Sequence, residues 1–183
     1  MTIHWVCPEC GLDYDTISPR DAAGAVRTFP RRYRNLLTRI FEPDEDLETA
    51  IRTRPAEGVW SALEYTCHVA QTLDLMAPTI RQIVNEDNPH LYAWDPDEQA
   101  EEQDYNDWTL LTALSELESA CADLSMAIEY TGAGEWTRVG TYDYGEREAI
   151  DVARNAVHEG AHHLRDVKNV LTQVLGRQID EPL

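Results

Sequence analysis

The chain has 183 residues, 43% of them hydrophobic, and five tryptophans, which is enough for one domain with a sizeable core and excludes a disordered chain. Its 34 acidic and 15 basic residues give a formal net charge of −19, which disfavours nucleic acid as a partner because phosphate groups are repelled. No stretch approaches the roughly 20 apolar residues of a membrane span. The first residues also lack the features of a signal peptide, so we expect a cytoplasmic protein without a membrane partner.

The N-terminal part of the chain predicts an extension followed by one domain. We expect residues 1–17 to be rich in loops and residues 18–183 to form the domain. Ser18 followed by Pro19 is typical of a helix start, with an N-cap and a first-turn proline. Because proline lacks a backbone N–H, Pro30 is expected to interrupt this helix.

Several shorter elements are expected between the first and the second long helix. A firmer helical segment should run from about residue 31 to 41, since apolar residues recur there at helical spacing. The acidic residues 44–52 are expected to add one or two turns. A second long helix should begin near Ser61 and end near Glu86, and Pro78 should kink it or loosen one turn.

The C-terminal half predicts two further long helices. Residues 87–107 are acidic and contain prolines, which indicates a long crossover connection. A third helix is expected over residues 108–130, and the glycine-rich segment that follows it favours a short hairpin. A fourth helix should run from about residue 146 to 175 and end at Gly176. Four amphipathic helices with little strand pattern predict an all-α four-helix bundle with a short N-terminal cysteine-containing extension.

Two histidines in the fourth helix have the spacing of a metal site. His158 and His162 are four residues apart, so they lie one turn apart on one face. They belong to a polar strip beside the apolar face of the helix, and polar groups next to a core are costly without partners. The strip comprises Asp151, Asn155, His158, His162 and Asp166.

His68 is the predicted third ligand, because it lies on the flank of the second helix as His158 and His162 do on theirs. Three histidines leave at least one coordination position open, as in catalytic metal sites. Zinc is the expected ion, with nickel, iron or manganese as alternatives. We expect His163 to be a neighbour of this site or a surface residue.

The same helix also contains a metalloprotease-like motif. Residues 158–162 have the sequence H-E-G-A-H, which matches the H-E-x-x-H pattern with Glu159 as general base. Gly160 is a poor helix former in a motif that needs a rigid helix, and no third-ligand pattern follows it. The sequence therefore favours another kind of metal site.

The sequence at the start of the second predicted helix resembles that of a known protein family. Residues 60–70, W-S-A-L-E-Y-T-C-H-V-A, resemble the corresponding helix start in the DinB/YfiT-like superfamily of proposed metalloenzymes, where a Trp-Ser pair caps the helix. In that family a histidine eight residues after the tryptophan binds metal, which corresponds to His68. The family's pair of histidines on its last helix corresponds to His158 and His162, and the resemblance spans about residues 20–175.

The resemblance implies more about fold and metal than about reaction. Members are similar in having an up-down-down-up four-helix bundle, often as a homodimer, that binds zinc, nickel or similar ions. Some members use a low-molecular-weight thiol such as mycothiol or bacillithiol as a cofactor for transfer or isomerisation. The resemblance therefore implies a divalent metal, and a thiol cofactor and a dimer as further options.

The extension carries a possible second metal site. Residues 7–11, C-P-E-C-G, form a zinc-knuckle half-site in which Cys7 and Cys10 are presented by a tight turn. Similar N-terminal motifs occur in a subgroup of the family. A closed site needs two more ligands, and the sequence leaves them open among His4, Cys67, Cys121 and a partner chain. Redox use of the pair and simple reduced thiols are the alternatives.

We therefore predict a metal-dependent enzyme acting on a small molecule, either a thiol-dependent transferase or a hydrolase. A metal ion would lower the pKa of a bound water or thiol. The candidates for orienting the imidazoles are Asp151, Glu159 and Asp166, and those for lining the pocket are Tyr65, Tyr142 and Tyr144. The residues available to bind the carboxylates of a thiol cofactor are Arg147, Arg154 and Arg165. The alternatives are a stress- or damage-responsive protein with a structural metal, and a helical interaction module.

Overall fold

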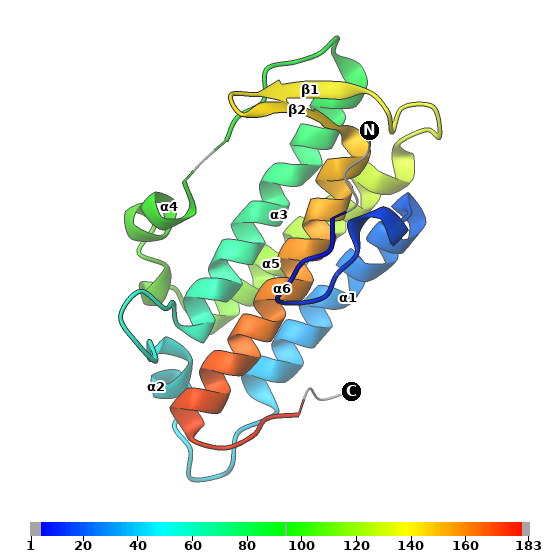
Figure 1. Cartoon of the computed structure of the whole chain (residues 1–183). Helices are drawn as coiled ribbons and strands as arrows, with labels where there is room; N and C mark the ends of the chain where they lie inside the picture. The colour runs from blue at the N-terminus through cyan, green and yellow to red at the C-terminus, as the bar shows by residue number, and fades with distance from the viewer. Residues whose placement is uncertain (1–4, 94, 181–183) are drawn as a thin grey trace.

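Four long helices pack side by side in the computed structural model, which describes residues 5–93 and 95–180 (Figure 1). The helices are α1 (Pro19–Thr38), α3 (Ala62–Asn85), α5 (Leu110–Tyr130) and α6 (Ala149–Leu175). Helices α1 and α3 each pack chiefly against α5 and α6, so they occupy opposite corners of the bundle. The predicted all-α four-helix bundle is confirmed.

The order of helix directions explains the long connection between α3 and α5. Tyr105 Oη, just before α5, donates to Gln71 Oε1 at 2.7 Å, and Arg81 near the end of α3 pairs with Asp123. Helices α3 and α5 therefore run in the same direction, and the chain must return along the bundle between them (Figure 1). This return contains helix α4 (Pro96–Glu102) and the 3₁₀ turn η2 (Tyr105–Asp107), which the sequence did not indicate.

The predicted helix ends are confirmed by their capping contacts. The Ser18 side chain accepts from the N–H of Asp21, whose carboxylate accepts from the N–H of Ser18. Ser61 and Glu64 form the same box at the start of α3. Gly176 ends α6 with φ of 65°, a left-handed conformation that favours glycine.

The prediction that Pro30 interrupts the first helix is wrong. Helix α1 continues through Pro30, and α3 likewise continues through Pro78. A proline inside a helix costs about 3 kcal/mol, but burial of a large apolar side chain contributes about 1.5–3 kcal/mol. Phe29 and Tyr33 flank Pro30 and are completely buried, so packing of α1 against the bundle outweighs the lost hydrogen bond.

Short elements cover the ends of the bundle. Helix α2 (Leu47–Arg52) accounts for the predicted acidic turns, and the 3₁₀ turn η1 (Tyr14–Thr16) lies in the extension. Strands β1 (Val139–Tyr142) and β2 (Gly145–Glu148) form the predicted hairpin as an antiparallel pair, in which Val139 faces Glu148. The hairpin lies at the opposite end of the bundle from α2 (Figure 1).

Gly160 allows α1 and α6 to approach closely. A Cβ atom at this position would lie 2.2 Å from a ring carbon of Phe29, which no side chain could tolerate without a shift. The Tyr33 hydroxyl donates to the Gly160 carbonyl at 3.1 Å. The glycine that weakens the metalloprotease motif is therefore a packing residue. Across the described ranges, no helix is long and apolar enough to cross a membrane.

Candidate metal centre

Helix α6 carries two pairs of potential ligands that are offset by one residue. His158 and His162 form one pair, and Glu159 and His163 form the other, each separated by one helical turn. Successive residues in a helix are rotated by about 100°, so the two pairs point in different directions. Each pair belongs to a different cluster of metal-binding side chains.

The first cluster lies between α3 and α6 and comprises His68, Glu159 and His163. We call it the bundle cluster. One oxygen of Glu159 lies 3.4 Å from His68 Nε2 and 3.3 Å from His163 Nε2. The His68 side chain is 5% exposed, and those of Glu159 and His163 are 20% and 17% exposed, so all three are largely shielded from water.

Aromatic rings and a carboxylate hold the histidines of the bundle cluster in place. Trp60 packs with its ring centroid 5.2 Å from that of His68. Tyr65 stacks on His163 at 5.3 Å, and Asp166 lies 2.8 Å from His163 Nδ1. Because Asp166 engages one ring nitrogen, the other nitrogen of His163 is directed toward Glu159.

The carboxylates and imidazoles of the bundle cluster shift one another's titration. Burial would raise the pKa of the Glu159 carboxyl, but hydrogen bonds from the surrounding imidazoles outweigh burial and hold that pKa well below its usual range. Burial would lower the pKa of His163, but the carboxylates of Asp166 and Glu159 outweigh it and raise that pKa to about 9. Glu159 is therefore ionised and available as an anionic ligand.

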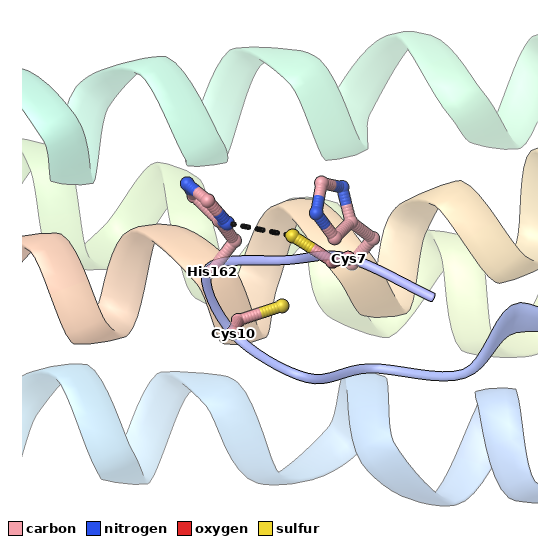
Figure 2. Close-up of side chains that lie close together, drawn as sticks. Cys7, Cys10 and His162 are labelled. Carbon is pink, nitrogen blue, oxygen red and sulfur yellow. Dashed lines mark hydrogen bonds between the residues drawn. The ribbon is translucent and has the colours of Figure 1, made fainter. Parts of the chain in front are cut away.

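The second cluster joins the extension to α6 and comprises Cys7, Cys10, His158 and His162. We call it the knuckle cluster. Its potential ligand atoms all lie within 4.8 Å of one another. Figure 2 shows both thiols on the N-terminal loop beside α6, with Cys7 Sγ 3.6 Å from His162 Nδ1. The backbone N–H of Cys10 lowers the pKa of Cys7 to about 6, against the effect of burial.

The three histidines predicted to share one ion fall into separate clusters. His68 belongs to the bundle cluster, whereas His158 and His162 belong to the knuckle cluster, and no cluster within the described parts of the chain joins all three. The reason is the rotation of α6, which directs residues 159 and 163 toward α3. A single ion on the three histidines remains a prediction without a bound metal to test it.

Sequence reasoning missed the place of His163, which was expected to be a neighbour of the site or a surface residue. The signal was present, since Glu159 and His163 have the same four-residue spacing as the chosen pair. Asp166 lies beside His162 and His163. Asp151 accepts from the backbone N–H of Glu148 at the start of α6, where it also lines a cavity beside the hairpin.

The structure places two of the four candidates that the sequence left open for completing the cysteine site. His4 lies outside the described residues. Cys67 and Cys121 are buried in the bundle core, where burial raises the pKa of both thiols to about 12. Neither thiol belongs to a cluster of potential ligands within the described residues, so the structure does not bring either residue to the cysteine site.

A cavity of about 790 Å³ borders both clusters. The extension, the hairpin, α3 and α6 surround it. The predicted pocket residues Tyr142, Tyr144, Arg147 and Arg154 line it. It is also lined by Trp5, Tyr14, Met76, Asn155, His158 and Glu159, among others. Of the other predicted pocket residues, Tyr65 instead stacks on His163, and Arg165 lies near Glu9 on the outside of α6.

The fold is shared with solved bacterial proteins. The chain is similar to YfiT from Bacillus subtilis, which is described as a probable metal-dependent hydrolase with an unusual four-helix bundle topology. The TM-score is 0.76 at 12% identity, and the match covers 90% of this chain and 93% of YfiT. It is also similar to a mycothiol-dependent maleylpyruvate isomerase, with a TM-score of 0.65, 14% identity and coverage of 84% and 62%. At these low identities, the TM-scores show a shared fold alone.

A third similar structure is a conserved protein from Enterococcus faecalis, with a TM-score of 0.64, 14% identity and coverage of 86% of this chain and 97% of that protein. A comparison with curated protein sequences found no significant match. The family model of the DinB superfamily matches residues 25–167, a range that includes α3, α5 and both ligand pairs of α6. On this match, the chain belongs to the DinB superfamily.

Proposed function

We propose that this protein is a metal-dependent enzyme that acts on a small anionic molecule, with its reactive metal held by the bundle cluster. The observation that carries the proposal is the convergence of His68, Glu159 and His163 at the edge of the 790 Å³ cavity, which Glu159 itself lines. Titratable clusters beside cavities of this size are typical of active sites.

The chemistry of the bundle cluster fits a divalent metal ion. Two imidazoles and one carboxylate are the ligand set of several catalytic zinc sites, and they also suit other first-row metals. The ligand atoms lie within 4.8 Å of one another, which an ion can bridge with small side-chain movements. A metal held by three protein ligands would lower the pKa of a water or thiol bound beside them.

The residues around the cavity have separate roles in the proposed reaction. Asp166 contacts Nδ1 of His163, and the Tyr65 ring stacks on the His163 imidazole. Together these contacts would keep the other ring nitrogen of His163 facing Glu159. Arg147 and Arg154 line the cavity and would bind carboxylates of the substrate. The stacked rings of Tyr142 and Tyr144 would contact its apolar part.

The reaction is a transfer or a hydrolysis in this proposal. The similarity to a mycothiol-dependent isomerase supports a low-molecular-weight thiol as cofactor. The arginines of the cavity also support it, since such a thiol carries carboxylates or hydroxyls that arginines bind. The similarity to a probable metal-dependent hydrolase supports metal-bound water instead. We propose the thiol reaction first, since the two arginines face the cavity together.

The metal assignment is tested by the metal content of purified variants. His68→Ala and His163→Ala should each lose one bound ion, and His90→Ala, which changes an exposed histidine, should lose none. Undiminished metal affinity in the first two variants would contradict the proposal that the bundle cluster binds the metal. If His68→Ala and His162→Ala lose the same ion, the ion belongs to His68, His158 and His162 instead.

The thiol assignment is tested by spectroscopy and calorimetry. Mycothiol added to cobalt-loaded protein should produce an additional thiolate-to-cobalt charge-transfer band. Arg147→Gln should weaken mycothiol binding about tenfold, as expected for loss of a charged hydrogen bond, whereas Lys168→Gln, outside the cavity, should not. Absence of the band, together with metal-dependent hydrolysis of ester or amide substrates, would favour the hydrolase.

A further inference from the structure

We propose that Cys7, Cys10, His158 and His162 form a second, closed zinc site that fastens the N-terminal extension to α6. Two thiolates and two imidazoles are a complete ligand set for tetrahedral structural zinc. The four ligand atoms converge within 4.8 Å although they come from segments 155 residues apart for Cys7 and His162. A second ion here would be separate from the one proposed for the bundle cluster.

The extension has the backbone conformation of a metal-binding turn. The Cys7 N–H donates to the Leu12 carbonyl at 2.9 Å, and the Gly11 N–H donates to the Cys7 carbonyl at 2.9 Å. Gly11 has a φ of 74°, a left-handed conformation that favours glycine. This turn directs both sulfur atoms toward α6 (Figure 2).

The two histidines present one ring nitrogen each toward the thiols. His162 Nε2 lies 3.5 Å from both Asp166 and Glu9, and its Nδ1 lies 3.6 Å from Cys7 Sγ. Metal-binding histidines in proteins usually have this arrangement, in which a carboxylate engages the nitrogen that does not bind metal.

His158 provides an independent indication of a missing ligand. Its Nδ1 lies 3.8 Å from the Glu159 carboxylate, and its Nε2 is buried without a hydrogen-bond partner among the residues that the structure describes. Buried polar atoms are nearly always paired, so an unpaired nitrogen beside two thiols points to an ion. Cys7 is itself 4% exposed and therefore also shielded from water.

The site would also complete the wall of the cavity. Trp5, Tyr14 and Asp15 of the extension line the cavity. The Tyr14 hydroxyl donates to Asn155 Oδ1 at 2.8 Å, and Trp5 packs edge-to-face on His158 at 5.3 Å. An ion that fixes Cys7 and Cys10 against α6 would hold these aromatic side chains in position on either side of the cysteine turn.

Cobalt substitution in the full-length protein tests this proposal, because thiolate ligands give cobalt an intense near-ultraviolet charge-transfer band. The band is expected in wild-type protein and should disappear in Cys7→Ser/Cys10→Ser, together with one bound zinc ion. Cys67→Ser/Cys121→Ser is the matched control, since it removes two thiols outside the cluster. This control should keep the charge-transfer band and the bound zinc ion. A band that survives the first double substitution would overturn the proposal.

Two adjacent histidines separate this proposal from the proposed function. His162→Ala should lose the thiolate-bound ion, whereas His163→Ala should keep it and lose the other ion. If His163→Ala has no effect while His162→Ala behaves as expected, only the proposed function fails. If His162→Ala leaves the thiolate band and zinc affinity unchanged, the knuckle site fails.

Thiol protection gives a measurement on unmodified protein, in case a variant does not fold. Cys7 and Cys10 should resist alkylation with zinc bound and react after chelation, as read by mass spectrometry. Proteolysis should then cut within residues 5–17 while circular dichroism shows intact helices. Equal reactivity before and after chelation, or isolation of a Cys7–Cys10 disulfide from anaerobically purified protein, would contradict the site.

Discussion

At the scale of single residues, α6 determines which side chains can meet. Two ligand pairs with the same spacing occur one residue apart, and only the rotation of the helix assigns each pair to a partner. The sequence predicts that this helix carries ligands, because the four-residue spacing is local. It cannot predict the rotation, because this depends on packing against α1 and α3.

Gly160 offers a direct test of that packing. Gly160→Ala should destabilise the protein by about 1–3 kcal/mol, the usual cost of overpacking a core, because the added Cβ would overlap the Phe29 ring. Chemical denaturation measures this difference. Gly24→Ala in α1 is the control, since a Cβ there meets nothing within 4 Å. The control should be stabilised by about 0.5–1 kcal/mol, and equal effects at both positions would contradict the proposed close approach.

At the scale of secondary-structure elements, the sequence predicts the long helices well. Capping residues such as Ser18, Ser61 and Gly176 act on their own neighbours, so their effect is visible in the sequence. Helix α4 within the long connection was missed, because acidic residues and prolines also suit loops. The sequence indicated only the two cysteines of the knuckle cluster. It did not indicate the two histidines beside them, because no periodic pattern in the sequence predicts where the extension runs along α6.

The two prolines of α1 should differ in their effect on the stability of the protein. Pro30→Ala should stabilise the protein, by up to about 3 kcal/mol, because alanine restores the N–H that an interior helix position needs. Pro19→Ala should have a much smaller effect, since first-turn N–H groups have no partner within the helix. Urea denaturation of both variants gives the comparison. Destabilisation by Pro30→Ala would show that the proline ring itself contributes essential packing.

At the scale of the whole molecule, the C-terminal segment is joined to the loop after α1. Arg177 donates to the Glu45 carboxylate at 2.9 Å through Nε and to the Ile40 carbonyl. The hydrogen bond from Arg177 and the N–H of Glu42 lower the pKa of Glu45 from 4.5 to about 2. The carboxyl therefore binds its proton less readily in the folded chain than in the unfolded chain.

This difference predicts how stability depends on pH. A lowered folded-state pKa stabilises the fold above the unfolded value of 4.5, and the contribution is lost as the pH falls toward about 2. Glu45→Gln should therefore be less stable than wild type at neutral pH, with a difference that shrinks as the pH falls through this range. Denaturation at a series of pH values tests this, with the exposed Glu57→Gln as control. A difference independent of pH would contradict the ion pair.

The contact between Phe29 and Gly160 has a consequence for how many ions one helix can serve. Gly160 lies in the sequence between the first and the second members of both ligand pairs of α6, and the Phe29 ring of α1 occupies the space that its missing side chain leaves. Rotation of α6 about its own axis would break this contact and is therefore disfavoured. Each ion would then keep its own donors, and one metal could exchange with solution without drawing ligands away from the other.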